Sequence, residues 1–158
     1  MTQRHRPGLL ARLRSRRSDQ TPPDHSGREE QVEEGTDMTN VDVILKEAVQ
    51  IDGAVAALLV DYQSGMALGQ AGDATVMNLD VAAAGNTDVV RAKMRTMESL
   101  GLNDTIDDIL ITLGQAYHLI NLPKDHPGLF IYLVLDKSKA NLAMARHKLS
   151  SLSTQIEI

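Results

Sequence analysis

Two runs of apolar residues, Ala54 to Val60 and Leu129 to Leu135, set the strongest limit on what this chain can fold into. Neither run alternates with polar side chains, as a strand with one solvent-exposed face would. Both runs are also far shorter than the roughly 20 residues that a membrane-spanning helix needs. They are therefore predicted to be central strands of a sheet that is covered on both faces.

The other predicted elements follow from apolar spacing and from cap or turn residues. The first predicted helix begins at its N-cap Asn40 and ends at Asp52 and Gly53. A turn at 62–65 then leads into a strand at 66–68, and a helix at 78–100 follows and stops at Gly101. The last predicted elements are strands at 109–113 and 116–122 and a helix capped by Ser138. The sequence thus predicts an α+β fold with a five-stranded antiparallel sheet flanked by helices. The predicted order is helix, two strands, helix, three strands, helix.

The charge pattern separates a tail at residues 1–38 from a domain at residues 39–158. Residues 1–17 contain six arginines and no acid, residues 18–37 are acidic, and the whole chain has a formal charge of −5. Because the tail lacks a sustained apolar period, it is predicted to be disordered. A second hypothesis is that translation starts at Met38 and that the preceding residues are an over-long gene start. The basic head is expected to be a solvated tail, with weak contact to an anionic membrane as the alternative; no DNA or RNA partner is expected.

The compartment is predicted from what the sequence lacks. It contains no cysteine, which is compatible with a reducing environment. Only Leu9, Leu10 and Ala11 follow the first arginines, where a signal peptide needs an apolar stretch of about 7 to 15 residues. We therefore expect a cytoplasmic protein.

No motif in the sequence predicts catalysis, a cofactor or a bound metal. A phosphate loop would need glycines followed by Lys and Ser or Thr, and this pattern does not occur. We interpret His118 as a packing or hydrogen-bonded strand residue and Ser64 as a turn residue rather than a nucleophile. Asp107 and Asp108 are interpreted as surface carboxylates rather than a metal or acid–base pair, since neighbouring strand residues point to opposite faces. The protein is therefore predicted not to be an enzyme.

The element order and three stretches of the sequence resemble the roadblock/dynein light-chain family. The stretches are AALLVDYQSGMALGQAG, TDVVRAKMRTMESLGLNDTIDDILITLGQAYHLINL and GLFIYLVLDKSKANLAMARHKLSSL. Within that pattern, the turn from Asp61 to Gly65 ends the first strand and residues 109–122 form a hairpin. The loop at 123–128 departs from the pattern, because it is longer and richer in proline than a tight hairpin. We expect a bacterial member of this family.

The resemblance implies a dimer that forms through the long second helix and the edge strand before Gly114. The implied interface residues are Val90, Met94, Met97, Ile109 and Ile111. For the two methionines, packing in the core and contact across the interface remain alternatives.

The resemblance also implies a function. Members of the family are regulatory or scaffolding modules, several of which bind small Ras-like GTPases and raise or modulate their activity. A non-enzymatic module of this kind, and among these a GTPase-activating protein, is the leading hypothesis. The alternative is a profilin-like ligand-sensing domain. A sensor should enclose a cavity of several hundred cubic ångströms, whereas a dimeric adaptor should have a solid core.

Overall fold

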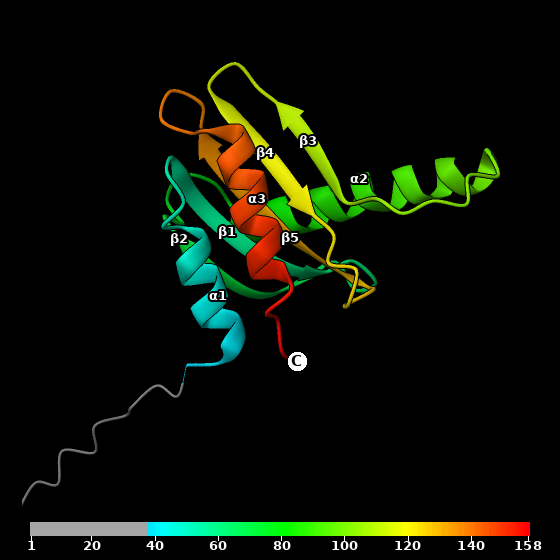
Figure 1. Cartoon of the computed structure of the whole chain (residues 1–158), viewed down its shortest axis with the longest axis horizontal. Helices are drawn as coiled ribbons and strands as arrows, with labels where there is room; N and C mark the ends of the chain where they lie inside the picture. The colour runs from blue at the N-terminus through cyan, green and yellow to red at the C-terminus, as the bar shows by residue number, and fades with distance from the viewer. Residues whose placement is uncertain (1–37) are drawn as a thin grey trace, which may run out of the picture. The chain divides into compact units, whose positions relative to one another are not determined.

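The computed structural model describes residues 38–158, and the predictions for residues 1–37 lie outside the described residues. Three helices and five strands follow one another in the predicted order (Figure 1). They are α1 (Asn40–Ala48), β1 (Ala54–Asp61), β2 (Met66–Gly72), α2 (Leu79–Ser99), β3 (Asp108–Thr112), β4 (Ala116–Asn121), β5 (Leu129–Asp136) and α3 (Leu142–Ser153). All neighbouring strands are antiparallel, in the order β2-β1-β5-β4-β3. The predicted fold class is confirmed.

The two apolar runs pair with each other at the centre of this sheet. In the antiparallel register of β1 and β5, Leu58 lies opposite Tyr132 and Leu59 lies opposite Ile131. These four residues are at most 1% exposed. Because successive strand residues point to opposite faces, each strand needs cover on both sides. The prediction of doubly covered central strands is confirmed.

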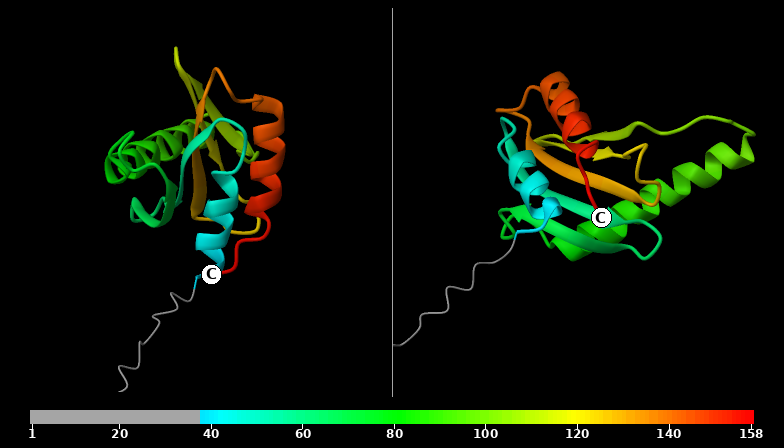
Figure 2. Two further views of the ribbon diagram at one scale, coloured as in Figure 1. Left: turned by 90° about the vertical axis from the view of Figure 1, so that its left-hand side faces the viewer. Right: turned by 60° about the horizontal axis from the view of Figure 1, so that its bottom comes forward.

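The helices supply that cover in two layers, and Figure 2 shows the sheet between them. On one face, which we call the α1/α3 face, Leu45 and Leu149 pack with Leu133 in one core cluster. On the opposite α2 face, Val90 packs with a second cluster that contains Phe130. The C-terminal part of α2 extends beyond the sheet (Figures 1 and 2). Within residues 38–158, no helix is both long and apolar enough to cross a membrane.

The predicted cap of the first helix is wrong by one residue. Thr39, not Asn40, is the N-cap, and it forms a capping box in which the Asp42 carboxylate accepts a hydrogen bond from the Thr39 backbone N–H. A reciprocal pair of this kind satisfies two backbone donors that a single cap would leave open. Asn40 is instead the first helical residue, and its side-chain oxygen accepts a hydrogen bond from the Glu157 N–H at 2.9 Å. The helix also ends earlier than predicted, at Ala48.

The predicted cap of the last helix is also wrong. The N-cap of α3 is Asn141, whose side-chain oxygen accepts a hydrogen bond from the Met144 N–H. Ser138 lies in the turn after β5, where its hydroxyl donates to the Asp136 carboxylate at 2.6 Å. Because the Ser138 hydroxyl is bonded to this carboxylate, it does not cap the helix. The N-cap of α3 lies three residues after Ser138.

A close approach between two turns fixes the frame around the central strands. Gly53 precedes β1 with a φ of 81°, and a Cβ added there would lie 2.7 Å from the backbone nitrogen of Ala140. The Gly53 carbonyl accepts a hydrogen bond from the Asp136 N–H at 2.7 Å. Only glycine combines this φ with this closeness at little cost.

Replacing this glycine should therefore destabilise the domain. We expect Gly53→Ala to lower the free energy of unfolding by about 2 kcal/mol or more, because it adds a steric overlap to an unfavourable φ. Urea denaturation followed by circular dichroism measures this change. Gly114→Ala is the matched control, since a Cβ at Gly114 meets no atom within 4 Å. Equal stability of the two variants would contradict the role of Gly53.

Candidate interaction surface

The strand β3 forms a free edge of the sheet, as the sequence predicted. It pairs with β4 on one side and, within residues 38–158, with no strand on the other. In this register Ile109 lies opposite Ile120, and Ile111 lies opposite His118. Because Ile120 belongs to the core under α2, both isoleucines of β3 lie on the α2 face. They are half-buried and neighbour an unpaired row of backbone donors and acceptors.

The helix α2 has one face in the core and one in solvent. Ala83 and Val90 lie on the inner face and are at most 1% exposed. The outer face includes Val81, which is 67% exposed, Val89, which is 37% exposed, and the exposed Gly85. The outer face therefore combines small apolar residues with exposed charged ones, among them Asp88 and Arg95.

The three residues of α2 that the resemblance places at the dimer interface, Val90, Met94 and Met97, differ in how far they are buried. Val90 has no exposed surface in the described domain, so its contribution is to hold α2 against the sheet. Met94 is half-buried and packs at the border of the same core. Met97, one turn further along, is also half-buried. Sequence spacing identified the stripe but not which of its members reach the surface.

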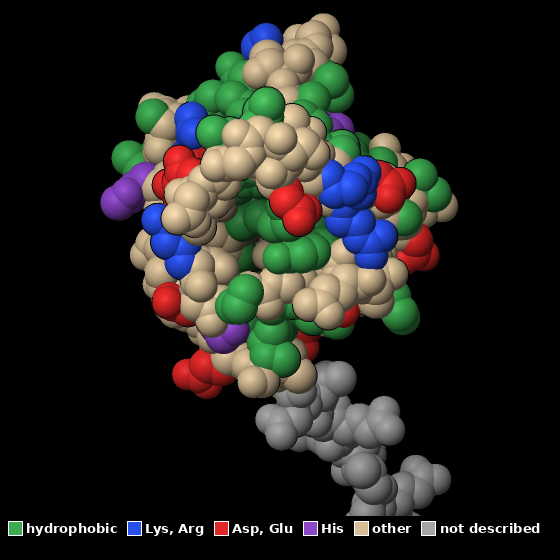
Figure 3. All heavy atoms as spheres, turned by 90° about the vertical axis from the view of Figure 1, so that its right-hand side faces the viewer, with side chains coloured by type: hydrophobic (Ala, Val, Ile, Leu, Met, Phe, Trp, Pro, Cys, Tyr) green, Lys and Arg blue, Asp and Glu red, His purple; other side chains and the backbone are tan. Residues whose placement is uncertain are grey.

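An apolar groove of about 520 Å³ opens beside the last turns of α2. Figure 3 shows this end of the domain, with a hollow that has a hydrophobic floor and charged side chains around it. We call it the α2 groove; its lining residues are Tyr62, Met94, Met97, Glu98, Leu102, Asp104, Thr105, Ile106, Leu122, Pro123, Lys124, Pro127, Gly128 and Leu129. The proline-rich loop that departs from the family pattern is one wall of this groove.

Hydrogen bonds from Tyr62 hold two walls of the groove together. The Tyr62 N–H donates to the Gly128 carbonyl at 2.9 Å, and the Gly128 N–H donates to the Tyr62 hydroxyl at 3.1 Å. Arg91 of α2 donates to the Tyr62 carbonyl at 2.8 Å. The turn after β1, the loop after β4 and the helix α2 therefore form one connected frame. The sequence did not single out Tyr62 or Arg91, since their partners lie tens of residues away.

The turn after β1 is built by Asp61. Its carboxylate accepts hydrogen bonds from the Gln63 N–H at 2.7 Å and from the Ser64 hydroxyl at 2.8 Å. These bonds, together with the charge of Arg91, hold the pKa of Asp61 below its usual range. The interpretation of Ser64 as a turn residue is confirmed.

The two neighbouring aspartates at the start of β3 have separate ionic partners. Asp107 pairs with Lys124 at 2.9 Å, and Asp108 pairs with Arg146 at 2.6 Å. Residues 38–158 contain no group of three or more His, Cys, Asp or Glu side chains that could hold a metal ion. The aspartates therefore act here as ion-pair partners, and the second of them ties the edge strand to α3.

His118 lies on β4, half-buried on the α2 face of the sheet. Its Nδ1 is 2.8 Å from the Tyr132 hydroxyl, and the two rings meet edge to face. This contact confirms the interpretation of His118 as a packed, hydrogen-bonded residue. Burial lowers the pKa of His118 and raises the pKa of Tyr132, because it disfavours the charged form of each group.

The lowered pKa of His118 should make stability depend on pH. The unfolded chain, in which histidine has a pKa of about 6.5, takes up a proton more readily than the folded domain. The free energy of unfolding should therefore fall as pH falls below about 6.5, by at most roughly 1.4 kcal/mol per pH unit from this group. We expect His118→Gln to flatten the slope between pH 5 and 8, as measured by urea denaturation. An unchanged slope in the variant would contradict this assignment.

The whole described fold can be compared with known proteins. No protein-family model and no curated protein matches the chain. MglB of Myxococcus xanthus superposes with a TM-score of 0.66 at 14% identity, over 75% of this chain and 93% of that one. A Roadblock/LC7 domain from Streptomyces avermitilis gives 0.62 at 14% identity, over 72% and 91%. The gliding protein MglB from Thermus thermophilus gives 0.58 at 18% identity, over 74% and 90%. The chain therefore has the roadblock/LC7 fold that its sequence predicted.

Proposed function

We propose that residues 39–158 form a non-enzymatic dimeric module that binds a small Ras-like GTPase and regulates or scaffolds it. The observation that carries this proposal is the outer face of α2, where the exposed Val81, Gly85 and Val89 lie on the same side of the sheet as the edge strand β3. The family resemblance supplies the class of partner. A cytoplasmic location and a bacterial source stay predictions.

Gly85 gives the strongest argument for a second subunit on α2. It lies inside the helix, and a Cβ added there would meet no atom within 4 Å. A glycine inside a helix costs about 0.5–1 kcal/mol relative to alanine. Nothing in the described domain offsets that cost, since Gly85 makes no close packing contact and has no positive φ. Close approach of a second helix would offset it.

The edge of β3 complements the helix contact. Among the described residues no strand pairs with its outer side, and Ile109 and Ile111 lie on the α2 face of the sheet. A two-fold axis beside β3 would pair this strand with its own copy and bring the two α2 helices together. Dimerisation would then cover both the outer face of α2 and the edge of β3, which supports a homodimer over an isolated domain.

The α2 groove is the surface that we assign to the GTPase. Its lining is largely apolar and includes Leu102, whose side chain is 51% exposed. In this role the module needs no catalytic group of its own, because the GTPase carries the nucleotide. The resemblance to the gliding protein MglB is compatible with this role and supports the fold alone.

A ligand-sensing function is the second candidate, and the volume of the groove favours it. The α2 groove has about 520 Å³, which lies within the range of small-molecule pockets, about 300–1,000 Å³. The groove opens to solvent, however, as Figure 3 shows, whereas a sensor was expected to enclose its ligand. The core clusters on the two faces of the sheet are packed with side chains. These observations favour a macromolecular partner.

The dimer can be tested at Gly85. We expect Gly85→Leu to weaken dimerisation by roughly 5- to 150-fold, because the added side chain overpacks the helix contact at about 1–3 kcal/mol. Light scattering of the full chain over a range of concentrations measures the association, and circular dichroism checks that the variant folds. Gly114→Leu is the matched control. A native chain that is monomeric at micromolar concentration would contradict the dimer.

The GTPase can be tested by capture from a lysate of the source organism. We expect the tagged full chain to retain a small GTPase that prefers either GDP or a non-hydrolysable GTP analogue. Leu102→Glu, at a 51%-exposed position in the groove lining, should reduce recovery at least tenfold, since it places a charge in the apolar groove, while the dimer remains. Leu68→Glu, at a 49%-exposed site on β2, is the control that should keep full recovery. A stable dimer that retains no GTPase with either nucleotide would reject the GTPase function.

A further inference from the structure

A second pocket lies on the α1/α3 face and shares Leu122, Pro123 and Lys124 with the α2 groove. It has a volume of about 380 Å³ and lies where β4 ends, β3 begins and the last turn of α3 ends. We call it the β4–α3 pocket; its lining residues are Asp107, Asp108, Asn121, Leu122, Pro123, Lys124, Asp125, Ser150, Ser153 and Thr154. In contrast to the α2 groove, most of these residues are polar.

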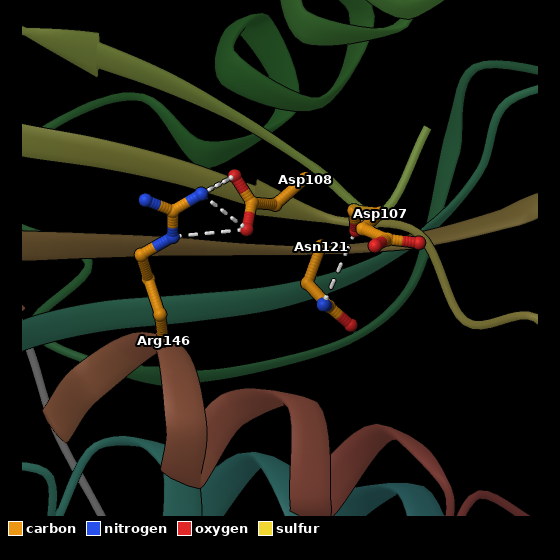
Figure 4. A network of polar contacts seen from close by, with 4 residues as sticks. All are labelled: Asp107, Asp108, Asn121 and Arg146. Atoms are coloured by element: carbon orange, nitrogen blue, oxygen red, sulfur yellow. Dashed lines mark hydrogen bonds and ion pairs between the residues drawn. The ribbon is translucent and has the colours of Figure 1, made fainter. Parts of the chain in front are cut away.

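Asn121 gives this pocket an unpartnered acceptor. The residue is 8% exposed, and its Nδ2 donates to the Asp107 carbonyl at 3.4 Å. Its Oδ1 is buried and has no hydrogen-bond partner among the described residues. Figure 4 shows this oxygen on the side of the amide that faces away from the Asp107 carbonyl, with α3 below. An unpaired buried acceptor is unfavourable, so a molecule with an N–H or O–H donor would be stabilised here.

The charges around the pocket favour a cation. Asp107 is paired with Lys124, and Asp108 is paired with Arg146 through three hydrogen bonds of 2.6 to 3.0 Å (Figure 4). Asp125 is exposed and forms no ion pair within residues 38–158. One negative charge is therefore left over.

The end of α3 adds to this preference. Ser150, Ser153 and Thr154 belong to its last turn and C-cap, and that turn has no basic residue. The C-terminal end of a helix carries a partial negative charge, which favours cations nearby. The helix end and the free carboxylate of Asp125 therefore act in the same direction.

The kind of cation follows from the donor groups. The described residues offer no cluster of three ligands for a metal, whereas an amide oxygen with a nearby carboxylate suits a cation that carries N–H groups. A guanidinium is planar and more weakly hydrated than an ammonium, so it loses less on leaving water. Leu122 and Pro123 provide apolar contact for the hydrocarbon stem of such a group. We propose that the β4–α3 pocket binds a guanidinium group, with Asn121 Oδ1 as hydrogen-bond acceptor and Asp125 as counter-charge.

The proposal is tested by titrating the isotope-labelled full chain with L-argininamide and following amide resonances by NMR. We expect saturable shifts of the Asn121 side-chain amide and of the Ser150 and Ser153 backbone amides. L-citrullinamide, a neutral analogue of similar shape, should cause no saturable shift. Because this readout concerns the α1/α3 face and is independent of dimerisation and GTPase capture, its failure is distinguishable from failure of the proposed function.

Three variants assign the binding to the named groups. Asn121→Leu should weaken binding at least about tenfold, since it removes a hydrogen bond to a charged group, while stability is kept or raised because the unpaired acceptor is gone. Asp125→Asn should weaken binding about threefold, as expected for an exposed ionic contact. Asp52→Asn, an exposed carboxylate on the loop after α1, should leave the affinity unchanged. Equal affinity of all three variants would overturn the site.

The guanidinium has two sources that the same experiment separates. Residues 1–17 of the chain contain six arginines, at positions 4, 6, 12, 14, 16 and 17, so the chain itself can supply the group. Replacing all six by glutamine should shift the Asn121 resonance and tighten argininamide binding if one of them occupies the pocket. Unchanged resonances together with saturable binding would identify an external guanidino compound or arginine side chain. No saturable binding to either chain at millimolar argininamide would overturn the proposal, since water would then suffice for Asn121.

Discussion

The pairing of β1 with β5 is the contact on which the rest of this structure depends. Both strands are apolar on both faces, so neither can lie at an edge or against solvent without losing the burial that drives folding. One helix layer is therefore needed on each side of the sheet. α1 and α3 cover one face, and α2 covers the other. Because a single helix covers the α2 face, its outer side and the nearby edge of β3 remain open to a partner.

The elements of this fold could be predicted from the sequence because their signals are local. Apolar runs, turn residues and helical spacing located all eight elements, including the free edge at β3. The caps were wrong where two polar side chains compete for one role. Serine is a residue type that favours the N-cap, but the hydroxyl of Ser138 is hydrogen-bonded to the carboxylate of Asp136. Asn141 caps the helix instead. Such a competition is decided by geometry that residue type does not encode.

The candidate sites were less predictable, because they join segments that are distant in the sequence. Two walls of the α2 groove are joined by the hydrogen bond between Gly128 and Tyr62, which are 66 residues apart in the sequence. Val90 fits the spacing of a helical stripe, yet it is fully buried beneath its own helix, while Gly85 is exposed. Asn121 had one signal that could have found it: it is a polar residue directly after the apolar pair Leu119 and Ile120, on a strand with a covered face. Spacing alone could not show that its oxygen has no partner.

The two candidate sites share a wall, and this has consequences for how they can communicate. Leu122, Pro123 and Lys124 line both the α2 groove and the β4–α3 pocket. Binding in one site can change affinity in the other only if this segment has two arrangements that the ligands distinguish. The ion pair between Lys124 and Asp107 is solvent-exposed and therefore a weak restraint. The bond network of Tyr62 and Gly128 holds the far end of the loop. Any coupling would therefore act through the residues that directly follow β4, while the far end of the loop stays in place.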